Sequence, residues 1–95
     1  MKHLIIVKAN ENAPSREAFM DAAKKAFSPV TQIPGVRSVR VIPGLKLSEN
    51  RFDFIVEIDM NRESLPLYDQ SEAHRLWKEN YGSWIEKKAI FDCEE

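Results

Sequence analysis

The chain has 95 residues, of which 43% are hydrophobic, enough for one modest core. We therefore expect a single domain over residues 1–95. Its 14 basic and 15 acidic side chains nearly cancel, which excludes the basic field that attracts nucleic acid or an anionic membrane. The apolar run HLIIV is far too short to span a bilayer. With one cysteine, Cys93, the chain forms no internal disulfide, so we expect a cytoplasmic protein.

The first third predicts a strand and then a helix. Residues 3–9, HLIIVKA, are rich in branched apolar side chains, and the turn-forming stretch NENAP follows them. Ser15 is a good N-cap for the segment SREAFMDAAKKAF. Its apolar side chains recur at helical spacing and form one face: Phe19, Ala22, Ala23, Ala26 and Phe27. Pro29 is expected to end this helix.

Two alternating segments follow and predict a pair of strands. After the turn signal Pro34-Gly35, residues 36–42 place Val39 and Val41 on the face opposite Ser38, Arg40 and Ile42. In RFDFIVEIDM the two faces are Phe52, Phe54, Val56 and Ile58 on one side, and Asp53, Ile55, Glu57 and Asp59 on the other. No segment long enough for a helix lies between the two strands, so we expect a hairpin.

The last third predicts helical segments and a final strand. Ser64 is expected to cap a short turn that tolerates Pro66, and Ser71 to cap a longer helix reaching about Glu86, with a break at 69–71. The longer helix carries an aromatic-rich stripe, which indicates packing on a sheet: His74, Trp77, Tyr81 and Ile85, with Trp84 adjoining. The segment KKAIFDCEE reads as the last strand.

The predicted order is strand, helix, strand, strand, helix, strand. This is the βαββαβ pattern of α+β ferredoxin-like domains, with an antiparallel sheet and helices on one face. Strands 3–9 and 51–60 each carry an apolar face, so the sheet face away from the helices also needs a cover. A second copy packed sheet to sheet would supply it, which predicts a homodimer that encloses a barrel.

Several motifs, in this order and at these spacings, resemble the stress-responsive dimeric α/β-barrel (Dabb) family. They are KHLIIVK, IPGVRSV, FIVEI, Tyr68 six residues before His74 in EAH, and EKKAIFD, and together they span nearly the whole chain. The resemblance implies a homodimer whose two sheets face each other. It implies no single activity, because many members of the family have no assigned reaction.

Tyr68 and His74 are the candidate catalytic pair. Histidine changes charge near neutral pH, and a tyrosine hydroxyl can donate to an enolate oxygen or fix the imidazole tautomer, so the pair suits proton abstraction beside a carbonyl. The family includes a plant polyketide cyclase, and resemblance to it implies His74 as the base and Tyr68 as the group that orients His74 and binds the carbonyl side of the substrate. The structural alternative is that His74 bonds to Tyr68 or to a backbone group across the helix break.

The remaining candidates are residues expected to line a ligand pocket: His3, Phe54, Val56 and Trp77. His3 matches a pocket histidine of the cyclase, although an ordinary position in the barrel interior or at an edge is an alternative. Phe54 stands where the cyclase has a histidine, and alanines at 22, 23 and 26 replace its bulky aromatic residues. No metal or cofactor is predicted, because the two histidines lack i, i+4 spacing and no cysteine or carboxylate cluster joins them.

Three functions agree with these features. The first is a dimeric barrel that binds a small carbonyl-bearing or aromatic molecule, with polyketide-cyclase-like proton transfer. The second is a non-catalytic, stress-responsive homodimer or larger assembly. The third, by analogy of fold alone, is a cofactor-free monooxygenase or isomerase. Nucleic-acid binding through Phe52 and Phe54 is disfavoured by the slightly acidic charge and the missing glycine-bearing consensus of RNA-recognition strands.

Overall fold

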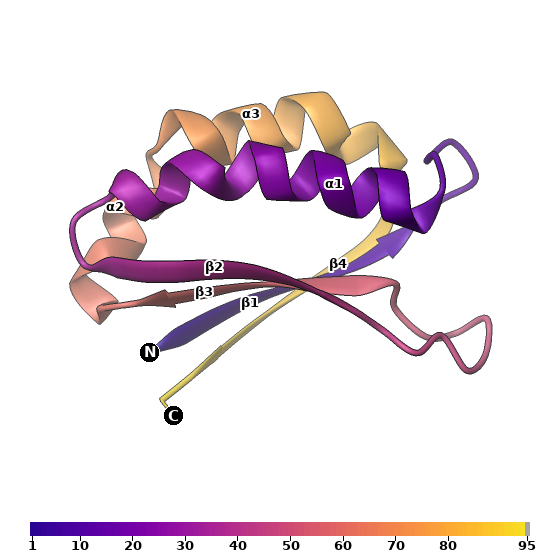
Figure 1. Ribbon diagram of the computed structural model, residues 1–95, viewed down its shortest axis with the longest axis horizontal. Helices are drawn as coiled ribbons and strands as arrows, with labels where there is room; N and C mark the ends of the chain where they lie inside the picture. Colours follow the sequence, from indigo (N-terminus) through magenta and orange to yellow (C-terminus); the bar gives the residue numbers. More distant parts are fainter. Residues whose placement is uncertain (95) are drawn as a thin grey trace.

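The predicted element order is confirmed in the computed structural model, which describes residues 1–94. One antiparallel sheet has the strand order β2-β3-β1-β4. The strands are β1 (Lys2–Ala9), β2 (Val36–Pro43), β3 (Phe54–Met60) and β4 (Ile85–Cys93). The helices α1 (Arg16–Phe27), α2 (Leu65–Asp69) and α3 (Glu72–Tyr81) cover one face of this sheet (Figure 1). None of the helices described is long and apolar enough to cross a membrane.

The alternating segments form strands with the predicted faces. Val39 and Val41 of β2 lie opposite Ile58 and Val56 of β3, on the side that faces the helices. In β3 the inward residues are buried and the intervening ones are only partly buried. Phe52 was predicted to share the apolar face of this strand, but the strand begins at Phe54 and Phe52 lies outside it. The amide N–H of Asp53, just before the strand, instead donates to the carbonyl of Val7 at 2.8 Å.

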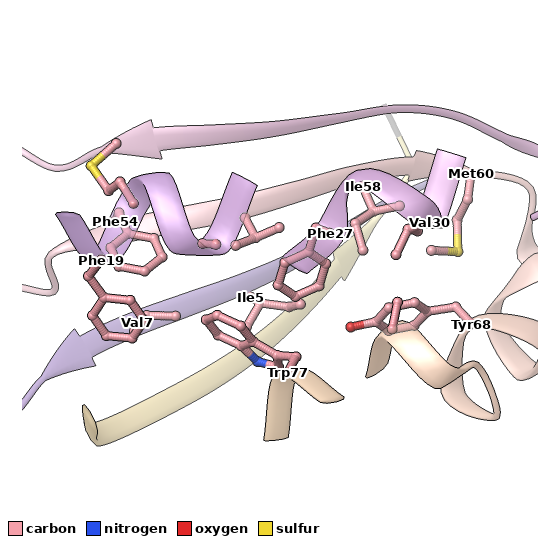
Figure 2. Close-up of a cluster of buried hydrophobic side chains, with 14 residues drawn as sticks. Ile5, Val7, Phe19, Phe27, Val30, Phe54, Ile58, Met60, Tyr68 and Trp77 are labelled. Atoms are coloured by element: carbon pink, nitrogen blue, oxygen red, sulfur yellow. The ribbon is translucent and has the colours of Figure 1, made fainter. Parts of the chain in front are cut away.

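Aromatic side chains form much of the core between the sheet and the helices (Figure 2). Phe19 of α1 packs edge-on against Phe54 at a ring-centroid distance of 5.0 Å. Phe27, one end of the same apolar helix face, lies 4.9 Å from Trp77 of α3. The sequence prediction for α1 is confirmed, since Ser15 Oγ accepts from the amide of the third helical residue at 3.1 Å.

The second long helix is shorter than predicted. It ends at Tyr81 rather than near Glu86, and a 3₁₀ turn at Gly82–Trp84 leads into β4. The reason is competition for backbone partners, since the carbonyl of Trp84 accepts from Asn10 at 2.8 Å and Ile85 pairs with Ala9. Pairing with β1 satisfies groups that a longer helix would have kept within itself.

Ser64 also acts differently from its predicted role as a cap. Its hydroxyl makes no capping bond to α2 and instead donates to the carbonyl of Pro34 at 2.6 Å. Gly35 beside it has a φ of 87°, and a Cβ built there would lie only 2.2 Å from Ser64 Oγ. The turn before β2 therefore requires glycine, both for its backbone and for its close contact with Ser64.

The sheet face away from the helices carries a different apolar set from the one predicted to need a cover. Strand residues such as Ile5, Val7 and Val56 point toward the helices and are buried. Their neighbours along the strands share the opposite face and are partly or fully exposed: Leu4, Ile6, Ile42, Ile55, Ala89 and Phe91. Phe91 is 56% exposed. No element among residues 1–94 covers this face (Figure 1).

Candidate functional site

A cavity of about 280 Å³ lies between α2, α3 and the helix-facing side of β1 and β4. Its lining includes residues that are far apart in the sequence: His3, Tyr68, His74, Trp77, Ile90 and Asp92. Four of the six residues predicted as a site are thus brought together. The other two, Phe54 and Val56, are almost fully buried in the core and do not line this cavity.

The junction between α2 and α3 places Tyr68 beside His74. Ser71 joins the two helices, because its Oγ donates to the carbonyl of Tyr68 at 2.7 Å and accepts from the amide of His74 at 3.2 Å. The rings of Tyr68 and His74 are then 4.9 Å apart, centroid to centroid. The six-residue spacing seen in the sequence therefore becomes a direct contact across the helix break.

The imidazole of His74 is held by a backbone group across that break. Its Nδ1 lies 3.0 Å from the carbonyl oxygen of Asp69. A carbonyl oxygen can only accept, so this bond places a proton on Nδ1. In the neutral ring Nε2 then carries the lone pair. The bond to the backbone and the position in the cavity, weighed as alternatives from the sequence, are both present.

Tyr68 supplies a buried hydroxyl to this region. Its side chain is 1% exposed, and the hydroxyl has no hydrogen-bond partner among residues 1–94. Figure 2 shows this hydroxyl pointing toward Trp77, another residue of the cavity lining. Burial, together with the nearby charge of Asp69, raises the pKa of Tyr68 well above its usual value. The hydroxyl therefore keeps its proton at neutral pH, and its donor capacity is unused among the described residues.

The raised pKa of Tyr68 predicts a loss of stability in alkali. Above about pH 10 the unfolded chain releases the tyrosine proton first, so the folded state binds more protons and the free energy of unfolding falls as the pH rises. We expect the Tyr68→Phe variant to show a shallower decline between about pH 9 and pH 11. Urea unfolding followed by tryptophan fluorescence measures this slope. Equal slopes for the variant and the wild type would contradict the assignment.

His3 forms a second imidazole site with a carboxylate that the sequence analysis missed. Its Nδ1 lies 2.5 Å from Oδ1 of Asp92, and its side chain is almost completely buried. The ring of His3 is 5.5 Å from that of Tyr68, on the inner side of the sheet. Asp92 fixes the orientation of the imidazole and leaves Nε2 without a partner among the described residues. The two residues are directly opposite in the register of β1 and β4.

A larger groove of about 470 Å³ lies between α1 and α3, but it lacks this chemistry. It contains no histidine, and Ala26, one of the alanines that depart from the cyclase pattern, lies in it. We therefore place the candidate site in the smaller cavity. Within residues 1–94, three side chains of the types that bind metals do not gather at any one point.

Comparisons with known proteins find likeness in structure and not in sequence. No protein-family model matches the chain, and no curated protein matches it. A dimeric protein of unknown function and ferredoxin-like fold from Bacteroides fragilis superposes with a TM-score of 0.78 at 17% identity, covering 99% of this chain and 94% of the other.

Two other solved structures superpose nearly as well. A dabb family protein with a ferredoxin-like fold from Mesorhizobium loti has a TM-score of 0.73 at 13% identity, covering 99% of this chain and 94% of its own. A Nitrosomonas europaea protein assigned provisionally as an antibiotic biosynthesis monooxygenase has a TM-score of 0.70 at 15% identity, with 97% and 88% covered. At these identities the likeness concerns the fold. The chain therefore has the ferredoxin-like fold of the Bacteroides and Mesorhizobium proteins.

Proposed function

We propose that this protein binds a small carbonyl-bearing or aromatic molecule in the 280 Å³ cavity. When the bound molecule has a carbonyl group, the protein transfers a proton at the carbon next to it. One observation carries the proposal, namely that a buried tyrosine, whose hydroxyl has no partner among residues 1–94, has its ring close to two oriented imidazoles. A buried polar group left unpaired costs free energy, so such a group at a cavity wall is typical of a ligand site.

The geometry suggests a role for each group. His74 Nε2 removes a proton from the carbon beside the carbonyl, the C–H bond breaks, and its electron pair forms the carbon–carbon double bond of an enolate. The negative charge that moves onto the carbonyl oxygen is stabilised by a hydrogen bond from the Tyr68 hydroxyl. His3, oriented by Asp92, lies beside the Tyr68 ring and is assigned the exchange of a proton with the same oxygen.

Exchange of hydrogen for deuterium tests this function without knowledge of the natural substrate. Phenylacetone, which has acidic protons beside a carbonyl and an aromatic ring, would be incubated with the protein in D₂O and its proton signals followed by NMR. We expect exchange faster than in buffer containing the His74→Gln/Tyr68→Phe double variant. Equal rates with the wild type and the double variant would refute catalysis on this probe and favour the non-catalytic alternative.

We also propose that a second copy covers the open sheet face. The likeness to dimeric proteins of the same fold supports this occupant, and so does the apolar row formed there by Leu4, Ile6, Ile55 and Phe91. Apolar side chains gathered on one face are typical of an interface between subunits.

A charge on that face is expected to separate the dimer. Sedimentation of the wild type should give twice the 11.0 kDa mass of one chain. The Phe91→Glu variant should associate at least about 100-fold more weakly, because a carboxylate would be buried in the interface without a partner. Leu67→Glu is the matched control, since Leu67 is 48% exposed on α2, on the other side of the sheet. A wild-type monomer, or an unaffected Phe91→Glu dimer, would count against the interface.

A further inference from the structure

A second hollow of about 240 Å³ is lined by Trp77, Lys78, Gly82, Ile85 and Lys88. It shares Trp77 and Lys88 with the first cavity. The two hollows thus adjoin at Trp77 and Lys88, between α3 and the outer strand β4, and are called the groove from here on.

The inner side of β4 forms one wall of this groove. Asp92, Ile90 and Lys88 alternate along the strand and lie opposite His3, Ile5 and Val7 of β1. Asp92 and Lys88 are four positions apart along the strand, a distance of about 13 Å. Ile90, midway between them, is 51% exposed although it faces the helix side. The groove is thus elongated, with an apolar middle formed by Ile90 and Trp77.

The two ends of the groove differ in charge. At one end the carboxylate of Asp92 is engaged by His3. Away from Asp92, where the second hollow adjoins the first, Lys78 and Lys88 make no ion pair with any of residues 1–94, whereas Lys8, beside β4, pairs with Glu86. Two cations that lack partners at the end of an apolar groove are suited to an anionic group on a ligand.

We infer that the ligand is an elongated carbonyl compound whose far end carries an anionic group such as a carboxylate, bound by Lys88 with Lys78 beside it. The reacting carbonyl lies near Tyr68, the chain covers Ile90 and Trp77, and the anion reaches Lys88. This inference rests on the proposed function for the position of the carbonyl. The preference for an anion rests on the lysine end of the groove alone.

A matched pair of probes tests the inference. 9-Oxodecanoate and its methyl ester share the ketone and the chain and differ in the terminal charge. We expect calorimetry to show that the acid binds about fivefold more tightly than the ester at low salt, the scale of one exposed ion pair. The preference should shrink as the salt concentration rises. Lys88→Gln should remove the preference. Lys87→Gln, on the opposite face of the same strand, should keep it.

The outcomes separate this inference from the proposed function. Equal binding of acid and ester, a preference that survives Lys88→Gln, or no binding of either probe would overturn the inference. Deuterium exchange at the carbon atoms beside the ketone is read independently on the ester. Exchange of the ester without any preference for the acid would leave the proposed function standing. A Lys88-dependent preference without exchange would support the anion site and refute the proton transfer.

Discussion

Tyr68→Phe is expected to slow proton exchange about 100-fold while it raises the free energy of unfolding by about 1 kcal/mol. The opposite signs have one cause. In the free protein the hydroxyl is buried without a partner among the described residues, so its removal relieves a cost of folding. During the reaction the same hydroxyl donates to the carbonyl oxygen that becomes negative. Its removal therefore takes away a hydrogen bond that stabilises the transition state and not the free protein.

Urea unfolding and the exchange assay on phenylacetone measure the two effects on the same preparation. Tyr81→Phe is the matched control, because Tyr81 lies on α3 but lines the 470 Å³ groove between α1 and α3 and not the candidate site. We expect this control to change the exchange rate less than twofold. If Tyr68→Phe were less stable than the wild type, the hydroxyl would have an unrecognised partner, and the case for a ligand site would fall.

His74→Gln is expected to lower the exchange rate by about 100-fold or more, the usual effect of losing a general base. Glutamine can still donate to the carbonyl of Asp69, so the junction between α2 and α3 should stay intact. The amide has no basic lone pair to accept a proton, so the chemistry is removed with little change of structure. The exchange assay gives the rate, and urea unfolding should give nearly the wild-type stability.

A change beside His3 gives a second exchange rate with which the rate of His74→Gln can be compared. In the Asp92→Asn variant His3 keeps a neighbour that can accept a hydrogen bond but loses the negative charge. We expect a smaller decrease, about tenfold, because His3 assists the oxygen and does not remove the proton from carbon. If Asp92→Asn lost more activity than His74→Gln, the roles of the two histidines would be reversed. Imidazole NMR signals, assigned with the two variants, would identify which ring a probe touches.

The strands could be predicted because their side chains alternate. The pattern in residues 54–60 identifies both the strand and its two faces, since a strand has a period of two wherever it lies. Ser15 and Ser71 likewise identify the starts of helices, because capping involves only neighbouring residues. The end of α3 could not be found in this way. The stop at Tyr81 depends on partners that β1 and Asn10 offer from the other end of the chain.

The candidate site shows the same division. Tyr68 and His74 are six residues apart, so a local helix break was sufficient to predict their contact. Asp92 was missed because it meets His3 across 89 positions of sequence, and only the register of β1 against β4 brings them together. Phe54 and Val56 were expected to line the pocket, but they lie on central β3, beneath α1, where the core is closed.

By itself, the sequence determined the order of the elements, the ferredoxin-like pattern and the neighbouring pair Tyr68 and His74, because these depend on periodicity, capping and short spacings. Only the tertiary structure decided which strand borders the groove. β4 lies at the sheet edge, next to α3, and its inner side therefore remains open enough to bring Asp92 and Lys88 to the cavity wall. Strand order is set by backbone pairing between distant segments, which no local pattern records.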